Sequence, residues 1–174
     1  ITVNAGNEDS VVRIVDLDDT GLETLRVNLR EGNNTLDATA MGPDVVLIIT
    51  SGSGNDLIQT GGGKDTVNSG GGDDIIYTGA NNDTVNAGSG NDEVHGETGN
   101  DTINGGSGED FLYGNEGNDI IDGGADADHI RGNDGNDELR GGDGNDEIFG
   151  DDGNDRIVGG QQDDILYGNN GDDL

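Results

Sequence analysis

A single aliphatic residue recurs at every ninth position through most of the chain. Its neighbours on both sides are mostly polar or mixed, as in Thr66 and Asn68 or Glu138 and Arg140. Because side chains alternate across a strand, this pattern predicts strands of about three residues whose middle side chain points inward. The recurring aliphatic residues are Ile58, Val67, Ile76, Val85, Val94, Ile103, Leu112, Ile121, Ile130, Leu139, Ile148, Ile157 and Leu166.

An aspartate stands two positions before each of these aliphatic residues, which makes the chain a nonapeptide repeat. Gly105 to Tyr113 is a clear copy, with glycine at positions one, two and four, aspartate at six and the aliphatic residue at eight. Complete copies run from Ser51 to Tyr167, followed by a partial copy. A strict period of this kind predicts a solenoid. The aspartates at position six are Asp56, Asp65, Asp74, Asp83, Asp92, Asp101, Asp110, Asp119, Asp128, Asp137, Asp146, Asp155, Asp164 and Asp173.

Position two has a second period, of eighteen residues. It alternates between glycine, as in Gly106 and Gly124, and a larger residue, as in Asn115 and Asn133. Alternate repeats are therefore not equivalent, and two nonapeptides form one coil. We expect an all-β solenoid with two short parallel sheets and with turns that stack along two edges.

Residues 1–50 differ from the repeats and form a β-rich segment. Strands are predicted at Val11–Val15, Leu25–Arg30 and Val45–Ile49, where apolar residues alternate or cluster. Turn residues separate them at Gly21, 32–34 and 42–44. Because solenoids need an end cap of atypical sequence, we favour a cap over the tail of a preceding domain. Residues 51–174 are the repeat domain.

Both ends of the chain indicate a piece of a longer polypeptide. Ile1 is not an initiator methionine, and the residues after it lack the pattern of a signal peptide. The last repeat stops at Leu174, before its own aliphatic position. We therefore expect the repeat domain to be truncated at its C-terminus.

The negative charge of the chain limits which molecules it can bind. The chain has 38 acidic and 7 basic residues, a formal charge of −31, and only 28% hydrophobic residues. Such a chain is expected to be disordered without metal and to repel nucleic acid and anionic membranes. The longest apolar run, Val45–Ile49, is too short to insert into a membrane. Multivalent cations are the natural counter-charge, and the absence of cysteine excludes thiolate metal sites.

The nonapeptides resemble those of the RTX (repeats-in-toxin) family. Gly105 to Tyr113 and Gly141 to Phe149 carry the family pattern, and the resemblance covers Ser51 to Leu174. It implies a right-handed parallel β-roll of the haemolysin type, with Ca²⁺ in the turns. It also implies a bacterial protein that leaves the cell by type I secretion and folds on meeting external calcium.

Calcium prefers six to eight oxygen ligands from carboxylates and carbonyls. Glycine at positions one, two and four allows the positive φ that turns carbonyls inward, and the aspartate supplies charge. One turn offers too few ligands, so we expect each ion to lie between stacked aspartates, such as Asp56 with Asp74 and Asp65 with Asp83. Two rows of seven aspartates then hold up to about twelve ions.

Three turns carry Asn81, Asp126 and Gln162 at position four instead of glycine, and we expect reshaped or weaker sites near them. Affinities of about 10⁻⁴–10⁻³ M, as in extracellular modules, suit a secreted or cell-surface location.

The function that these features favour is a calcium-binding structural module of a surface protein, of the adhesin or surface-layer type. The chain lacks the motifs of hydrolases and phosphate loops, so no enzymatic activity is expected. His95 and His129 flank inward positions and are expected to point to solvent. The alternative is the repeat region of a secreted enzyme or toxin, such as a protease, lipase or haemolysin, whose active domain lies elsewhere.

Two surface patterns leave further alternatives open. A Thr-x-Asn row, which begins at Thr66 and Asn68 and breaks at Ile120, has the regularity of an ice-binding face; threonine is also simply common in strands. An apolar row on the opposite face is either a contact surface for a neighbouring domain or subunit or ordinary cross-strand packing. This apolar row comprises Ile75, Tyr77, Phe111, Tyr113, Phe149, Ile165 and Tyr167.

Overall fold

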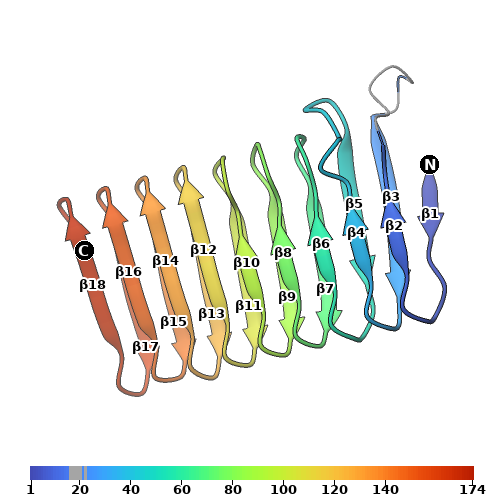
Figure 1. The fold of residues 1–174 in the computed structure, drawn as a ribbon. Coiled ribbons are helices and arrows are strands. Elements are labelled where there is room, and N and C mark those ends of the chain that lie inside the picture. The colour runs from blue at the N-terminus through green and yellow to red at the C-terminus, as the bar shows by residue number, and fades with distance from the viewer. Residues whose placement is uncertain (16–20, 22) are drawn as a thin grey trace.

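The computed structural model describes residues 1–15, 21 and 23–174, which form a β-solenoid of two stacked parallel sheets (Figure 1). Within these residues there is no helix, and hence none that could cross a membrane. The odd sheet contains β1 (Thr2–Asn4), β3 (Thr24–Arg30), β5 (Val46–Ser51), β7 (Thr66–Gly71), β9 (Thr84–Ser89), β11 (Thr102–Ser107), β13 (Ile120–Ala125), β15 (Glu138–Asp143) and β17 (Arg156–Gln161). The even sheet contains β2 (Val11–Arg13), β4 (Thr35–Asp37), β6 (Leu57–Gln59), β8 (Ile75–Tyr77), β10 (Glu93–His95), β12 (Phe111–Glu116), β14 (His129–Asp134), β16 (Glu147–Asp152) and β18 (Ile165–Asn170).

The coil repeats every eighteen residues, as the period at position two predicts. Neighbouring strands of one sheet are parallel, and from β5 and β6 onward they pair in this register, for example Val85 with Ile103 and Ile103 with Ile121. The earlier strands pair at larger offsets, as Val3 does with Val27 and Val27 with Ile49. Each nonapeptide therefore crosses from one sheet to the other, and identical repeat positions stack directly on one another. The predicted all-β class, the two parallel sheets and the eighteen-residue coil are confirmed.

Most strands are longer than the predicted three residues. β7, β9 and every strand from β11 onward contain six residues, while β6, β8 and β10 contain three. The longer strands run on through positions one to three of the next repeat, because stacked turn backbones also pair with one another. In β11, alternation then points both Ile103 at position eight and Gly105 at position one into the interior.

The aliphatic residues at position eight form the core of the repeat domain. From Ile58 to Ile148 all of them are buried, and Ile157 is partly buried against the same core. Leu166 is 46% exposed because it lies on β18, the last strand of the even sheet. The predicted inward column is thus confirmed up to the final coil.

The N-terminal segment continues the same two sheets. Val12 pairs with Leu36 and Leu36 with Ile58 in the even sheet, and Val27 pairs with Ile49 in the odd sheet. The predicted strands correspond to β2, β3 and β5. β1 and β4 were not predicted because each is short and lies outside the nonapeptide spacing.

Truncation of a buried leucine tests how much this core contributes to the free energy of unfolding. Leu112→Ala should lower the free energy of unfolding by about 2–5 kcal/mol, because Leu112 is fully buried and leaves a cavity. Leu166→Ala, at the same repeat position but exposed, should cost about 1 kcal/mol or less. Urea unfolding in calcium buffer, followed by circular dichroism, measures both, and equal losses would contradict the assignment of the core.

Candidate metal centre

The aspartates at position six stack in two rows, one along each edge of the solenoid. The Asp56 row contains Asp56, Asp74, Asp92, Asp110, Asp128, Asp146 and Asp164, and the Asp65 row contains Asp65, Asp83, Asp101, Asp119, Asp137, Asp155 and Asp173. Neighbours in a row are eighteen residues apart, so the predicted neighbours, such as Asp56 and Asp74, do lie together. All except Asp164 and Asp173 in the last coil are buried.

One carboxylate oxygen of each aspartate joins two coils. The backbone N–H of Asp92 donates to Oδ1 of Asp110 at 2.8 Å, and the same bond recurs throughout both rows at 2.7–3.1 Å. At the start of the rows, the N–H groups of Asn34 and Leu47 donate to Asp56 and Asp65. Each aspartate therefore holds the coil before it in register.

The second carboxylate oxygen, Oδ2, is buried without a hydrogen-bond donor. This holds for Asp65, Asp74, Asp83, Asp92, Asp101, Asp110, Asp119, Asp128, Asp137, Asp146 and Asp155. Among the described residues, the ion pairs lie on the outer faces, and none includes an aspartate at position six. Because a buried anionic oxygen is costly without a partner, these carboxylates need a proton or a cation that the other side chains do not supply.

The pKa values of these aspartates are raised, as expected for carboxylates that are buried without a positive partner. Burial raises the pKa of Asp83 to about 8. The hydrogen bond from the N–H of Asp65 opposes this rise, and the carboxylates of Asp65 and Asp101 add to it. Burial likewise raises the pKa of Asp110 to about 6 and that of Asp137 to about 7. Desolvation of the charged form is the largest cause in each case.

A glycine at position one lets an aspartate Oδ2 and a carbonyl oxygen of the next coil converge beside its Cα atom, and we call this arrangement the cradle. A Cβ atom on Gly105 would lie within 3.0 Å of both Asp110 Oδ2 and the carbonyl oxygen of Gly123 in the next coil. The φ angle of Gly105 is not positive, so the cradle, rather than the backbone, requires glycine there. The same pair of oxygens converges at Gly96, Gly105, Gly114, Gly123, Gly132, Gly141 and Gly150.

The prediction of positive φ is therefore wrong for position one and holds for most of positions two and four. Asn81, Asp126 and Gln162 at position four keep φ angles of 80°, 78° and 77°. The turns that lack this glycine thus retain their backbone shape, at some cost in strain. The larger residues at position two behave alike; they are Glu97, Asn115, Asn133, Asp151 and Asn169.

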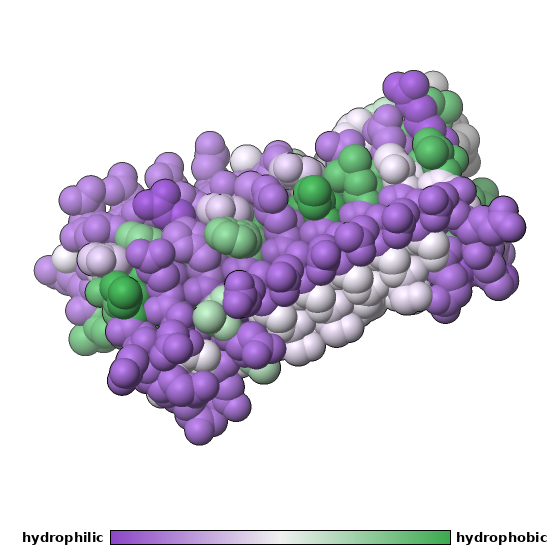
Figure 2. Space-filling view, turned by 60° about the horizontal axis from the view of Figure 1, so that its bottom comes forward, coloured by the Kyte–Doolittle hydropathy of each residue, from purple (hydrophilic) through white to green (hydrophobic). Residues whose placement is uncertain are grey.

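A second ladder runs through the residues at position five. The N–H of Asn118 donates to Oδ1 of Asn100, and the N–H of Asn136 donates to Oδ1 of Asn118. Donation here runs from the later coil to the earlier one, opposite to the aspartate rows. These exposed turns contribute to the hydrophilic rows on the surface (Figure 2). Sequence reasoning assigned Asn at position five only to turn formation, because the ladder depends on the stacking register.

Family comparison agrees with this geometry. A family model of the RTX calcium-binding nonapeptide repeat matches residues 50–85, 77–112, 86–121, 95–130, 113–148, 122–157 and 149–174. The chain belongs to the RTX calcium-binding nonapeptide repeat family. RTX repeats bind calcium and are typical of secreted proteins. No curated protein matches the sequence.

The donor atoms of these RTX turns suit calcium. Among the described residues, no three His, Cys, Asp or Glu side chains converge as a metal-binding group. The acidic ligands available are therefore the stacked aspartates, and carbonyl oxygens must complete the coordination. A hard, all-oxygen set of this kind suits calcium better than zinc or copper.

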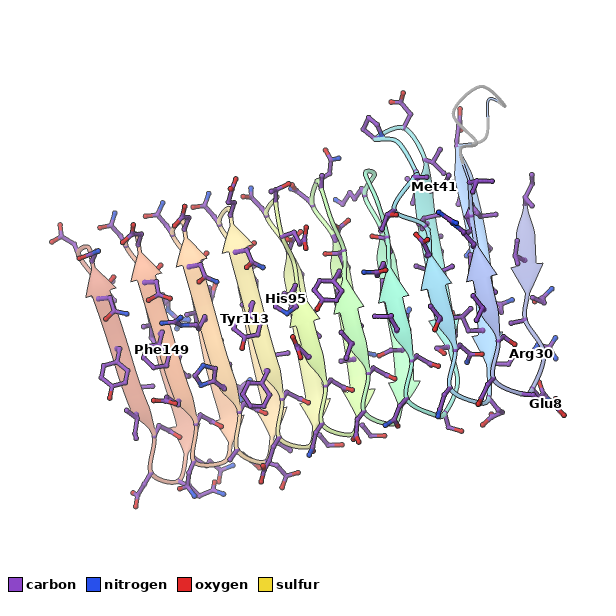
Figure 3. The ribbon with its side chains drawn as sticks, in the orientation of Figure 1. Glu8, Arg30, Met41, His95, Tyr113 and Phe149 are labelled. Atoms are coloured by element: carbon purple, nitrogen blue, oxygen red, sulfur yellow. The ribbon has the colours of Figure 1, made fainter. Side chains whose placement is uncertain are left out.

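The two histidines of the RTX domain lie outside this centre. His95 stacks between Tyr77 and Tyr113 on the outer face of the even sheet, at ring centroid distances of 4.8 and 4.6 Å (Figure 3). His129 contacts Phe149 in a tilted arrangement, at a ring centroid distance of 5.4 Å. Both point outward as predicted, but contacts with neighbouring side chains leave only 22% of the His95 side chain and 29% of the His129 side chain exposed.

The raised pKa values predict an unusual pH dependence for the calcium-free chain. In the folded chain Asp83, Asp110 and Asp137 have pKa values of about 8, 6 and 7, against 3.8 for the free side chain. Protonation therefore favours the folded state, an effect that is complete below about pH 4 and lost as the pH rises through 6 to 8. In chelator, the β-sheet circular dichroism signal should increase from about pH 8 to 5, with light scattering as the control for aggregation. A decrease over that range would contradict the burial of these carboxylates.

Proposed function

We propose that calcium ions bind between the stacked turns along both edges and that this binding drives folding of the repeat domain. The observation that carries the proposal is the buried Oδ2 that faces a glycine cradle and lacks a cation from the chain. The domain is a structural module and catalyses no reaction of its own.

The aspartates at position six would hold the ions together with carbonyl oxygens at position one. Asp110 Oδ2 and the Gly123 carbonyl oxygen, which approach the same cradle from adjacent coils, are one such pair. A bound ion would neutralise the carboxylate and connect the two coils. Since this arrangement does not exist in the unfolded chain, the free energy of binding becomes free energy of folding.

The setting that fits such a module is the outside of a cell. Sites built from few carboxylates are weak, about 10⁻⁴–10⁻³ M, and external calcium fills them. Stacked coils rise by about 4.8 Å each, so the domain is a straight spacer that calcium makes rigid. We propose a secreted or cell-surface protein of the adhesin or surface-layer type.

The alternative is the repeat region of a secreted enzyme or toxin, with the same calcium chemistry and an active domain elsewhere in the polypeptide. Ice binding has less support. The Thr-x-Asn row is in register over β7, β9 and β11, but it ends where Ile120 follows Thr102.

A matched pair of charge-removing variants tests the proposed sites. Asp110→Asn keeps an oxygen for the bond from Asp92 but removes the charge beside the Gly105 cradle. It should raise the calcium concentration at the folding midpoint by about twofold or more, because the ligand charge sets affinity. Glu109→Gln removes the same charge from an exposed neighbour and should leave the midpoint unchanged.

Circular dichroism during a calcium titration, started in chelator, measures both midpoints. The β-sheet signal of wild type should rise sharply at about millimolar calcium. A chain that is fully folded in chelator at pH 7, or equal shifts for the two variants, would refute calcium-driven folding through these aspartates.

A further inference from the structure

Position one divides the turns into two kinds. From Gly96 onward this position is always glycine, which leaves the cradle open. In the first repeats it carries a side chain instead, and each of these residues is buried. They are Ser51, Thr60, Ser69, Thr78 and Ala87.

The hydroxyl groups at position one bind the carbonyl oxygens that face the cradle in later coils. Ser69 Oγ donates to the Ala87 carbonyl oxygen at 2.7 Å, and Thr78 Oγ1 donates to the Gly96 carbonyl oxygen at 2.9 Å. Thr60 makes the equivalent bond to Thr78, and Ser51 donates to Asp56 Oδ2. In these turns a protein hydroxyl takes the place beside the oxygens that an ion would otherwise coordinate.

The Ser69 hydroxyl also lies beside the carboxylate of its own repeat. The Asp74 carboxylate, whose pKa burial raises, lies close to this hydroxyl. The hydroxyl proton goes to the carbonyl of Ala87, however, so Asp74 Oδ2 still has no donor. The Ser69 side chain therefore lies between the Asp74 carboxylate of its own coil and the Ala87 carbonyl oxygen of the next coil.

Steric exclusion extends this argument to Ala87, which has no hydroxyl. Ala87 and Gly105 are stacked positions of the same row, eighteen residues apart. A Cβ on Gly105 would come within 3.0 Å of two oxygens, closer than such atoms approach, so the methyl group of Ala87 must keep the equivalent oxygens of its own turn farther apart. The oxygens of that turn therefore cannot converge on one ion as those beside Gly105 can.

The apolar core thins along the chain as the cradles appear. β3 buries Leu25, Val27 and Leu29, and β5 buries Leu47 and Ile49. β7 buries the aliphatic Val67 and the polar Ser69. From β11 onward, an aliphatic residue and a glycine face inward in each strand of the odd sheet. The additional apolar burial therefore lies in β3 and β5, directly before the turns that keep a side chain at position one.

We propose that calcium binds only in the open glycine cradles, and that the turns from Ser51 to Ala87 are closed by their own side chains without metal. The inference rests on the proposed function, since it assigns the ions to the cradles. Two rows of seven aspartates have twelve gaps between neighbours; five of these gaps are closed, and the seven at Gly96 to Gly150 are open. The first coils then form a metal-independent base for the calcium-dependent ones.

A matched pair on one row tests this division. Ala87→Gly removes a methyl group and should add one bound ion. Gly105→Ala should remove one, because the new Cβ displaces Asp110 Oδ2, while its backbone angle permits alanine. Equilibrium dialysis of the whole chain against calcium, with metal analysis, should give about seven ions for wild type, eight for Ala87→Gly and six for Gly105→Ala. Circular dichroism at saturating calcium confirms that each variant is folded.

Anomalous diffraction from calcium-grown crystals locates the ions without any variant. Peaks beside Gly96 to Gly150, with none beside Ser51 to Ala87, would support the division. About twelve ions in wild type, with hydroxyls as added ligands, would overturn it and leave calcium binding intact. An unchanged count in folded Ala87→Gly would also overturn it. A wild-type chain that binds no calcium would instead refute the proposed function.

Discussion

Buried negative charge between coils is the constraint on which the solenoid depends. Each aspartate at position six gives one oxygen to the backbone of the coil before it, and this bond holds the other oxygen inside the turn, away from water and from any basic side chain. The register of the coils and the cation requirement thus come from the same carboxylate. A chain with a formal charge of −31 can stack its aspartates only when a proton or a cation neutralises them.

The apolar core and the metal centre share the same strands. In β11, Ile103 faces inward beside Gly105, so aliphatic packing and the cradle alternate along a single inner face. A larger residue at position one fills the core at the expense of the cradle, as Thr78 does. Apolar burial and ion binding are therefore alternatives at this position, and their balance changes from the N-terminal coils to the C-terminal ones.

Much of the fold follows from period alone. Ile103 and its equivalents predict the core, and the alternation of Gly106 with Asn115 predicts the coil, because both depend on local geometry that repeats without error. The strand lengths and the ladder through Asn118 were not predicted, since both arise only when identical turns pair. Gly105 was misinterpreted for a different reason: the sequence shows a glycine, but not whether the chain needs its φ angle or its empty volume.

The two ladders impose a rule on how the length of the domain can change. The aspartate rows donate toward later coils, the position-five ladder donates toward earlier ones, and both join residues eighteen apart. Removal of one whole coil would rejoin equivalent positions on the same edge. Removal of a single nonapeptide would move every later turn to the opposite edge. A turn with a larger residue at position two, such as Asn115, would then stack on a turn with glycine there, such as Gly106. The module should therefore lengthen and shorten by coils, with the nonapeptide as its sequence unit but not its unit of assembly.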